Sequence, residues 1–207
     1  KRTTSQPLPI LRSLSTAPGN PDAPGIVPPD VGTHGINLTI VRNNGSGGVL
    51  VTEGSSDNVL QELIVSGNTG PGVQITGSQT TRNTLTASLV GLRPSFNNNN
   101  QYIVDPNSGH GVLVDGQASF TRIGNNLDEG LFLGNVISGN GNDGIRIEGD
   151  VEFVTATGNF IGTVPAGTSA MPNTGDGVSI GGRAKNVTIG EAGSGRGNLV
   201  SGNTESG

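Results

Sequence analysis

The sequence predicts an all-β fold in which short strands stack in parallel as a solenoid, and two recurring motifs are the main evidence. In the first motif, Gly precedes a β-branched residue, one variable position and a second β-branched residue. It occurs five times, beginning at Gly48, Gly72, Gly111, Gly144 and Gly177. The second motif is Ser-Gly-Asn after an apolar pair, and it occurs three times, beginning at Ser66, Ser138 and Ser201. Self-similarity of this kind is typical of repeat architectures.

The composition supports the same fold class. Gly accounts for 36 of 207 residues, aromatic residues for 3%, and Trp is absent. The apolar residues are mostly Val, Ile and Leu in short runs between Gly and Asn, which is typical of many short strands joined by tight turns. In a stack of such strands, columns of β-branched side chains replace a layered aromatic core, and Gly at the corners supplies positive φ.

The spacing of the first motif indicates the size of one turn of the solenoid. Successive copies begin 24, 39, 33 and 33 residues apart. A turn of twenty-odd residues with three short strands suits a parallel solenoid, so the longer intervals contain loops. Two kinds of loop alternate along the chain, which makes the true repeat a pair of turns of about 66 to 72 residues.

The composition divides the chain into two regions. Residues 1–31 contain seven prolines and little periodicity, which predicts an extended lead-in or a cap. Residues 32–207 are expected to form the solenoid, with a first strand at residues 36–40, where apolar and polar residues alternate. Because the chain begins with Lys1 and shows no signal peptide, we expect a mature or trimmed form.

Four segments resemble a known kind of repeat. They are residues 134–140 (GNVISGN), 159–163 (NFIGT), 167–173 (GTSAMPN) and 186–190 (NVTIG). They resemble right-handed parallel β-helix repeats of the pectate-lyase-like type, as found in arrays within large secreted or surface-attached bacterial proteins. The resemblance covers residues 36–207 and implies a single-stranded right-handed parallel β-helix of about five to six rungs. It does not indicate an activity, because polysaccharide-degrading enzymes, epimerases, adhesins and filament subunits share this coil.

Stacking also predicts which residues share a column. Strands of successive rungs pair about 4.8 Å apart, so the first and third residues after each motif Gly should form two inward columns. The first column is Val49, Val73, Val112, Ile145 and Val178, and the second is Val51, Ile75, Val114, Ile147 and Ile180. Asn side chains at the corners can hydrogen-bond along the axis, and we expect Asn68, Asn140 and Asn203 to form such a ladder.

The residues that alternate with these columns point outward, and several of them are charged. The candidates are Asp115, with Glu148 one rung above it; Asp143, with His110 below it and Asp176 above it; and Arg146, beside Glu148. Paired carboxylates can bind Ca²⁺ through oxygen ligands, or can share acid and base roles in sugar cleavage. The simpler alternative is a polar face that keeps the coil soluble. The chain contains no Asp-Asp doublet and no Arg-x-Pro-x-x-Arg motif, although a resemblance to the hydrolases and lyases would imply them.

The first long loop is the most distinctive projection from the coil. It contains four consecutive Asn residues, 97–100, between Phe96 and Tyr102. Aromatic side chains on a polar loop can stack on a sugar ring, so Phe96 and Tyr102 are candidates for glycan binding; the alternative is that both pack on the coil wall. The segment from Tyr102 to Pro106 (YIVDP) also resembles the Tyr-Gly-Phe-Asp-Pro-His motif of alginate epimerases, but it lacks the final His.

Charge and cysteine content exclude several functional classes. The net charge is −5 and there is no basic run, which disfavours nucleic-acid or anionic-membrane binding. No apolar stretch is long enough to predict a membrane span. The absence of Cys excludes disulfides and thiolate metal sites.

We therefore expect an extracellular or cell-surface protein with a structural, adhesive or glycan-contacting role, and with Ca²⁺ as the candidate cofactor. The sequence stops partway through a rung, and an unpaired parallel edge invites pairing. The solenoid is thus expected to continue, or to associate end to end with another copy. The alternative function is a polysaccharide lyase, hydrolase or epimerase that acts on the outward acidic face.

Overall fold

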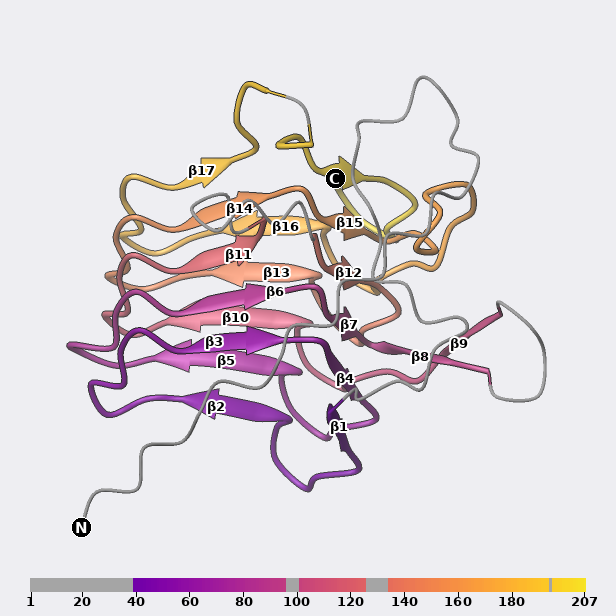
Figure 1. Ribbon diagram of the computed structural model, residues 1–207, viewed down its shortest axis with the longest axis horizontal. Helices are drawn as coiled ribbons and strands as arrows, with labels where there is room; N and C mark the ends of the chain where they lie inside the picture. The colour runs from indigo at the N-terminus through magenta and orange to yellow at the C-terminus, as the bar shows by residue number, and fades with distance from the viewer. Residues whose placement is uncertain (1–38, 96–100, 126–133, 194) are drawn as a thin grey trace, which may run out of the picture.

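The computed structural model of the chain describes residues 39–95, 101–125, 134–193 and 195–207, whose regular elements are all β-strands. Most of these strands form three parallel sheets that run along one axis (Figure 1). The first sheet contains β1 (Thr39–Arg42), β4 (Leu63–Ser66), β7 (Leu89–Val90), β12 (Val136–Ile137), β15 (Phe160–Ile161) and β18 (Leu199–Val200). The second contains β2 (Val49–Val51), β5 (Val73–Thr76), β10 (Val112–Asp115), β13 (Ile145–Ile147) and β16 (Val178–Ile180). The third contains β3 (Val59–Gln61), β6 (Thr84–Thr86), β11 (Arg122–Gly124), β14 (Thr155–Thr157) and β17 (Thr188–Ile189).

The chain visits the three sheets in a fixed order and so winds into a coil. Each rung gives one strand to the first, the second and the third sheet in turn, and each strand pairs in parallel with its equivalents in neighbouring rungs. Five rungs followed by β18 confirm the prediction of an all-β parallel β-helix with about five to six rungs. The predicted first strand is described only from Thr39, where β1 begins, and residues 1–31 lie outside the described residues.

The two predicted inward columns are confirmed by the register of the second sheet. Val73 pairs with Val112, which pairs with Ile145, and the third residues of the same strands pair in the same way. The central members of both columns are fully buried in the core. Ile180, in contrast, is 50% exposed, because β16 forms one edge of the second sheet.

The glycines of the two motifs are required for different reasons. A Cβ atom added to Gly111 or Gly144 would lie 2.7 Å from the carbonyl oxygen of the motif Gly in the next rung. Gly139, from the Ser-Gly-Asn motif, has a φ of 75°, which a residue with a side chain rarely adopts. The expectation of positive φ therefore holds for the second motif, whereas close packing of the rungs fixes the Gly of the first motif.

A ladder of six Asn side chains runs along the corner between the first and second sheets. Its members are Asn44, Asn68, Asn107, Asn140, Asn173 and Asn203. Each Nδ2 from Asn44 to Asn173 donates to the Oδ1 atom of the ladder Asn one rung further along, at 2.8–2.9 Å. Most of these amide groups also donate to a backbone carbonyl, as Asn107 does to Val65 at 3.0 Å. The predicted ladder of Asn68, Asn140 and Asn203 is therefore confirmed as half of a longer one.

The sequence motif missed Asn107 and Asn173 because neither belongs to a Ser-Gly-Asn triplet. Both follow a long loop, where Pro precedes the Asn instead. The spacing from the first motif is a better signal. An Asn stands four residues before each of the five motif glycines, and these five Asn residues all belong to the ladder. This constant spacing places the amide at the same corner in every rung.

Shorter ladders mark the other two corners of the coil. Before the first sheet, Asn135 donates from Nδ2 to Asn159 and Asn159 to Asn198, both at 3.0 Å. Before the third sheet, Asn58 donates to Asn83 at 2.8 Å. Hydrogen bonds along the axis therefore hold all three corners in register.

The corner between the second and third sheets carries a column of left-handed residues. Its members are Asp57, Arg82, Phe120, Phe153 and Asn186, with φ between 51° and 58°. Asn and Asp tolerate this conformation, whereas for a bulky residue it costs on the order of 1–3 kcal/mol. The two Phe rings stack with centroids 4.6 Å apart and planes 11° apart, an interaction worth about 0.5–1.5 kcal/mol. Stacking therefore offsets only part of the strain.

We predict that Asn140→Ala destabilises the coil by about 2–4 kcal/mol, because it leaves a buried amide of Asn107 and a buried oxygen of Asn173 without their side-chain partner. Urea unfolding followed by circular dichroism measures the effect. Asn142→Ala, at an exposed position in the same turn, is the matched control and should change stability by less than about 0.5 kcal/mol. Equal effects of the two substitutions would contradict a stabilising ladder.

Candidate functional site

The four candidate acidic residues lie beside the second sheet, and one of them is buried. Asp143 is buried in the turn before β13, and its Oδ1 atom accepts a hydrogen bond from the Asp176 backbone amide at 2.9 Å. Its Oδ2 atom lies 3.3 Å from His110 Nδ1 and 3.7 Å from Arg146 Nη1. The carboxylate thus connects three successive rungs.

Asp176 repeats the same arrangement one rung further along. Its Oδ1 atom accepts a hydrogen bond from the Ser206 backbone amide at 2.9 Å. Asp143 and Asp176 therefore each accept a hydrogen bond from a backbone amide of the next rung. The ladder Asn oxygens accept instead from a backbone amide of the preceding rung, as Asn173 Oδ1 does from Asn140 at 3.0 Å. The backbone contact is a structural reason for the Asp that directly precedes the motif Gly in these two rungs.

Arg146 is the basic residue at the centre of this face. Its guanidinium contacts Glu148 at 3.0 Å and donates to the Ser179 hydroxyl, one rung above, at 2.7 Å. Asp115 lies one rung below Glu148, because β10 and β13 pair in register. Its Oδ2 atom accepts a hydrogen bond from Gln74 Nε2 at 3.0 Å.

Each of the four candidate carboxylates therefore contacts a protein group. Within residues 39–95, 101–125, 134–193 and 195–207, no three His, Cys, Asp or Glu side chains gather closely enough to hold a metal ion. The geometry brings Asp143, Arg146 and Glu148 together, and it places Asp176 against the last described turn. Calcium binding and catalysis at these residues stay predictions.

His110 is held mainly in its neutral form. Partial burial lowers its pKa below the ordinary value of 6.5, with a smaller contribution in the same direction from the nearby Arg146 guanidinium. The carboxylates of Asp143 and Glu148 oppose this shift, but they do not reverse it. At neutral pH, Arg146 is therefore the charged partner of Asp143, and His110 is an uncharged neighbour.

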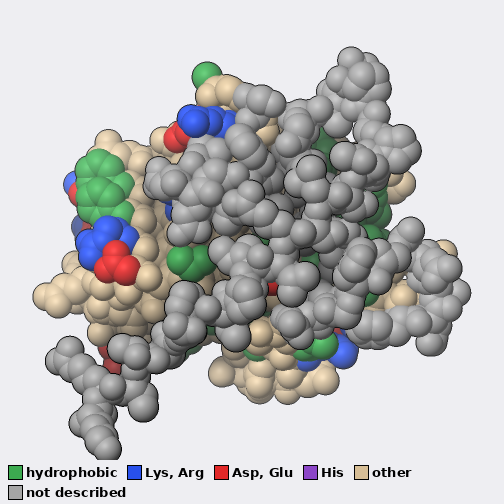
Figure 2. Space-filling view, in the orientation of Figure 1, with side chains coloured by type: hydrophobic (Ala, Val, Ile, Leu, Met, Phe, Trp, Pro, Cys, Tyr) green, Lys and Arg blue, Asp and Glu red, His purple; other side chains and the backbone are tan. Residues whose placement is uncertain are grey.

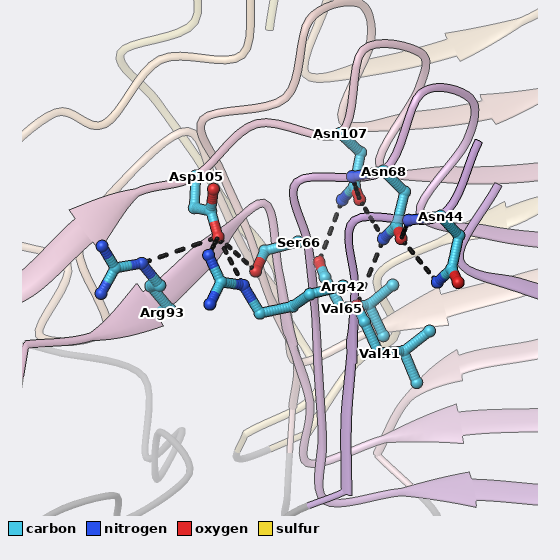
Figure 3. A network of polar contacts seen from close by, with 9 residues as sticks. All are labelled: Val41, Arg42, Asn44, Val65, Ser66, Asn68, Arg93, Asp105 and Asn107. Atoms are coloured by element: carbon cyan, nitrogen blue, oxygen red, sulfur yellow. Dashed lines mark hydrogen bonds and ion pairs between the residues drawn. The ribbon is translucent and has the colours of Figure 1, made fainter. Parts of the chain in front are cut away.

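A second polar network, absent from the sequence predictions, fixes an antiparallel hairpin against the first sheet (Figure 3). The hairpin consists of β8 (Leu92–Pro94) and β9 (Tyr102–Val104), and it ends at Asp105. Asp105 Oδ2 accepts hydrogen bonds from Arg42 Nε and Ser66 Oγ, both at 2.8 Å, and lies 3.6 Å from Arg93 Nε. One carboxylate thus joins residues of three rungs.

The same hairpin contains the residues predicted to contact glycans. Tyr102 is half-buried and packs on a core cluster that includes Leu92 and Phe160. Phe96 lies outside the described residues, so the predicted aromatic pair is described at one member only. In the segment that resembles the epimerase motif, Asp105 is already engaged by Arg42 and Ser66. The glycan-binding role of Phe96 and Tyr102 stays a prediction.

Comparisons with family models, with curated proteins and with solved structures found no match for this chain. In the part of the chain that the structure describes, no helix is long and apolar enough to cross a membrane.

We predict that His110 makes the folded coil less stable in mild acid. Because its pKa is lowered in the folded state, the unfolded chain binds more protons, and stability falls as the pH decreases below about 6.5. Urea unfolding of the native chain and of His110→Gln at about pH 7.5 and about pH 5 measures this effect. The native chain should lose more stability between the two pH values than the variant. Parallel losses in both proteins would contradict the assigned shift.

Proposed function

We propose that this chain is a structural or adhesive segment of an extracellular, pectate-lyase-like β-helix that is extended along its axis. The observation that carries the proposal is the direction of the Asn ladder. Each ladder amide from Asn44 to Asn173 donates toward the rung that follows, and Asn203 is the last acceptor. A further rung with Asn at the same corner would accept from Asn203 and prolong the ladder.

The backbone beside the last described rung supports the same proposal. Within the described residues, β17 and β18 each pair with another strand on one side only. Beyond β16, the carbonyls of Ser206 and Gly207 accept hydrogen bonds from Gly177 and Val178, in the position of the next rung. Further rungs of the same coil, or a second copy stacked head to tail, would satisfy the groups at this edge. The extracellular location rests on the resemblance of the repeats to secreted and surface-attached arrays.

The contacts of the acidic face favour this structural role over the enzymatic alternative. A general acid or base must be free to exchange a proton with the substrate. Asp143 and Asp176 instead accept backbone hydrogen bonds from the next rung, and Glu148 is paired with Arg146. Asp115 keeps one buried oxygen, Oδ1, without a hydrogen-bond partner among the described residues, so it is the candidate with unused capacity.

We predict that the isolated chain associates end to end and that Ile180→Lys weakens this association at least tenfold. Ile180 is 50% exposed at the edge formed by β16, so a charge there opposes docking of another rung while the core stays intact. Sedimentation velocity and small-angle scattering over a concentration series measure particle mass and length. Leu50, in β2, alternates with the inward residues Val49 and Val51 and faces outward, so Leu50→Lys is the lateral control and should leave association unchanged. A strictly monomeric native chain at high concentration would contradict the proposal.

The enzymatic alternative makes a different prediction. If the acidic face cleaves acidic polysaccharides, the native chain should release unsaturated or reducing ends from alginate or polygalacturonate. Replacing both Asp143 and Asp176 by Asn should then abolish turnover while the far-ultraviolet circular dichroism spectrum stays the same. On the structural account, the native chain shows no turnover on this panel, and the double variant is destabilised because an amide oxygen accepts these backbone hydrogen bonds more weakly than a carboxylate does.

A further inference from the structure

The stacked Phe pair on the corner between the second and third sheets is an exposed aromatic ridge. Phe120 is 53% exposed and Phe153 is 43% exposed. The chain has only five Phe residues, and these two are not used in its core. Figure 2 shows a hydrophobic patch at this edge of the molecule, directly above a basic and an acidic side chain. The ridge lies on the side of the coil, away from the axial ends, and therefore does not depend on axial association.

The backbone at this corner does not require Phe. The Phe120 amide donates to the carbonyl of Glu152, and the Phe153 amide donates to that of Lys185, in the same pattern that Arg82 follows below them. The next rung has Asn186 at the equivalent position, with the same left-handed φ. Asn is well suited to this conformation, so folding alone favours Asn over Phe in this column. Because Arg82 has the same left-handed φ, this conformation belongs to the corner itself. The feature that folding leaves unexplained is the exposure of two stacked rings.

The charged side chains around the ridge are paired with one another. Below it, both guanidinium nitrogens Nε and Nη2 of Arg82 contact Asp57, at 2.6 and 2.7 Å. In the turns that carry Phe153 and Asn186, Arg183 contacts Asp150 at 2.5 Å and Lys185 contacts Glu152 at 3.4 Å. Each pair joins one acidic and one basic group, so the three pairs carry no net charge, although the whole chain has a net charge of −5. They offer hydrogen-bonding groups beside the ridge without a surplus of either sign.

We propose that this corner binds a neutral polysaccharide. A pyranose ring has an apolar C–H face, which the Phe120–Phe153 ridge contacts, and a rim of hydroxyl groups, which bind paired charged side chains such as Arg82 and Asp57. Aromatic surface flanked by a few polar groups is the usual composition of such binding sites. The cancelled charges favour a neutral chain over an acidic one, because an acidic chain would meet the carboxylates without a surplus of basic groups.

The test is native affinity electrophoresis of the full chain in gels that contain hydroxyethyl cellulose, galactomannan or dextran, with alginate as the acidic comparison. At least one neutral polysaccharide should retard the native chain, and the F120N/F153N double variant should bind it at least tenfold more weakly. Asn already occupies the equivalent position in the next rung, as Asn186, with the same left-handed φ. The thermal unfolding midpoint of the double variant should therefore stay the same or rise. Leu50→Asn, another exposed apolar position, is the matched control and should bind as the native chain does.

Three outcomes would overturn the inference. The first is equal retardation of the native chain and the F120N/F153N variant. The second is retardation by alginate alone, or by none of the polysaccharides. The third is that the ridge pairs two copies of the chain side by side. Sedimentation velocity would then detect a dimer in the native chain that is lost in the double variant, while polysaccharide binding would be the same in both. None of these outcomes depends on the axial test, which changes Ile180 at the end of the coil.

Discussion

Hydrogen bonding along the axis, from one rung to the next, is the interaction on which the rest of this structure depends. Each rung is too small to bury its own apolar residues, so it is stable only against its neighbours. The Asn ladder fixes the register of that stacking, because a buried amide left without its partner is costly. The register then aligns the columns of Val and Ile into one core. Close packing between rungs explains the motif glycines, which have no room for a Cβ atom.

The same constraint separates structural residues from residues available for function. Asp143 and Asp176 extend the axial pattern with carboxylates, and Asp105 fastens a hairpin across three rungs. Carboxylates on the outer surface of a β-helix are attractive catalytic candidates, but these acidic groups make contacts that hold the fold together. The Phe column shows the opposite combination of properties. Phe120 and Phe153 are exposed and stacked where Asn would suffice, so their presence calls for an explanation in terms of binding.

Much of the fold could be predicted from the sequence, because the equivalent positions of a repeat show which residues pair between neighbouring rungs. The spacing of the motif glycines was enough to identify both inward columns and half of the ladder. The network around Asp105 could not be predicted in this way, since Arg42 and Asp105 are 63 residues apart and meet only through a loop outside the repeat. The Phe pair was missed for a related reason: aligned by the third sheet, it forms a column, but no motif marks that corner. The sequence indicated the strands beside which the acidic residues lie, yet it could not show that Asp143 is buried or that backbone amides engage Asp143 and Asp176.

Hydrogen exchange of the Asn side-chain amides tests the central claim most directly. With ¹⁵N-labelled protein, nuclear magnetic resonance resolves the Nδ2 groups of the ladder and follows their exchange with deuterium. We predict slow exchange for Asn107 and Asn140, in the middle of the stack, and progressively faster exchange toward Asn44 and Asn203 at its ends. Fast exchange of all six amides, as for exposed Asn142, would contradict a ladder that holds the rungs in register.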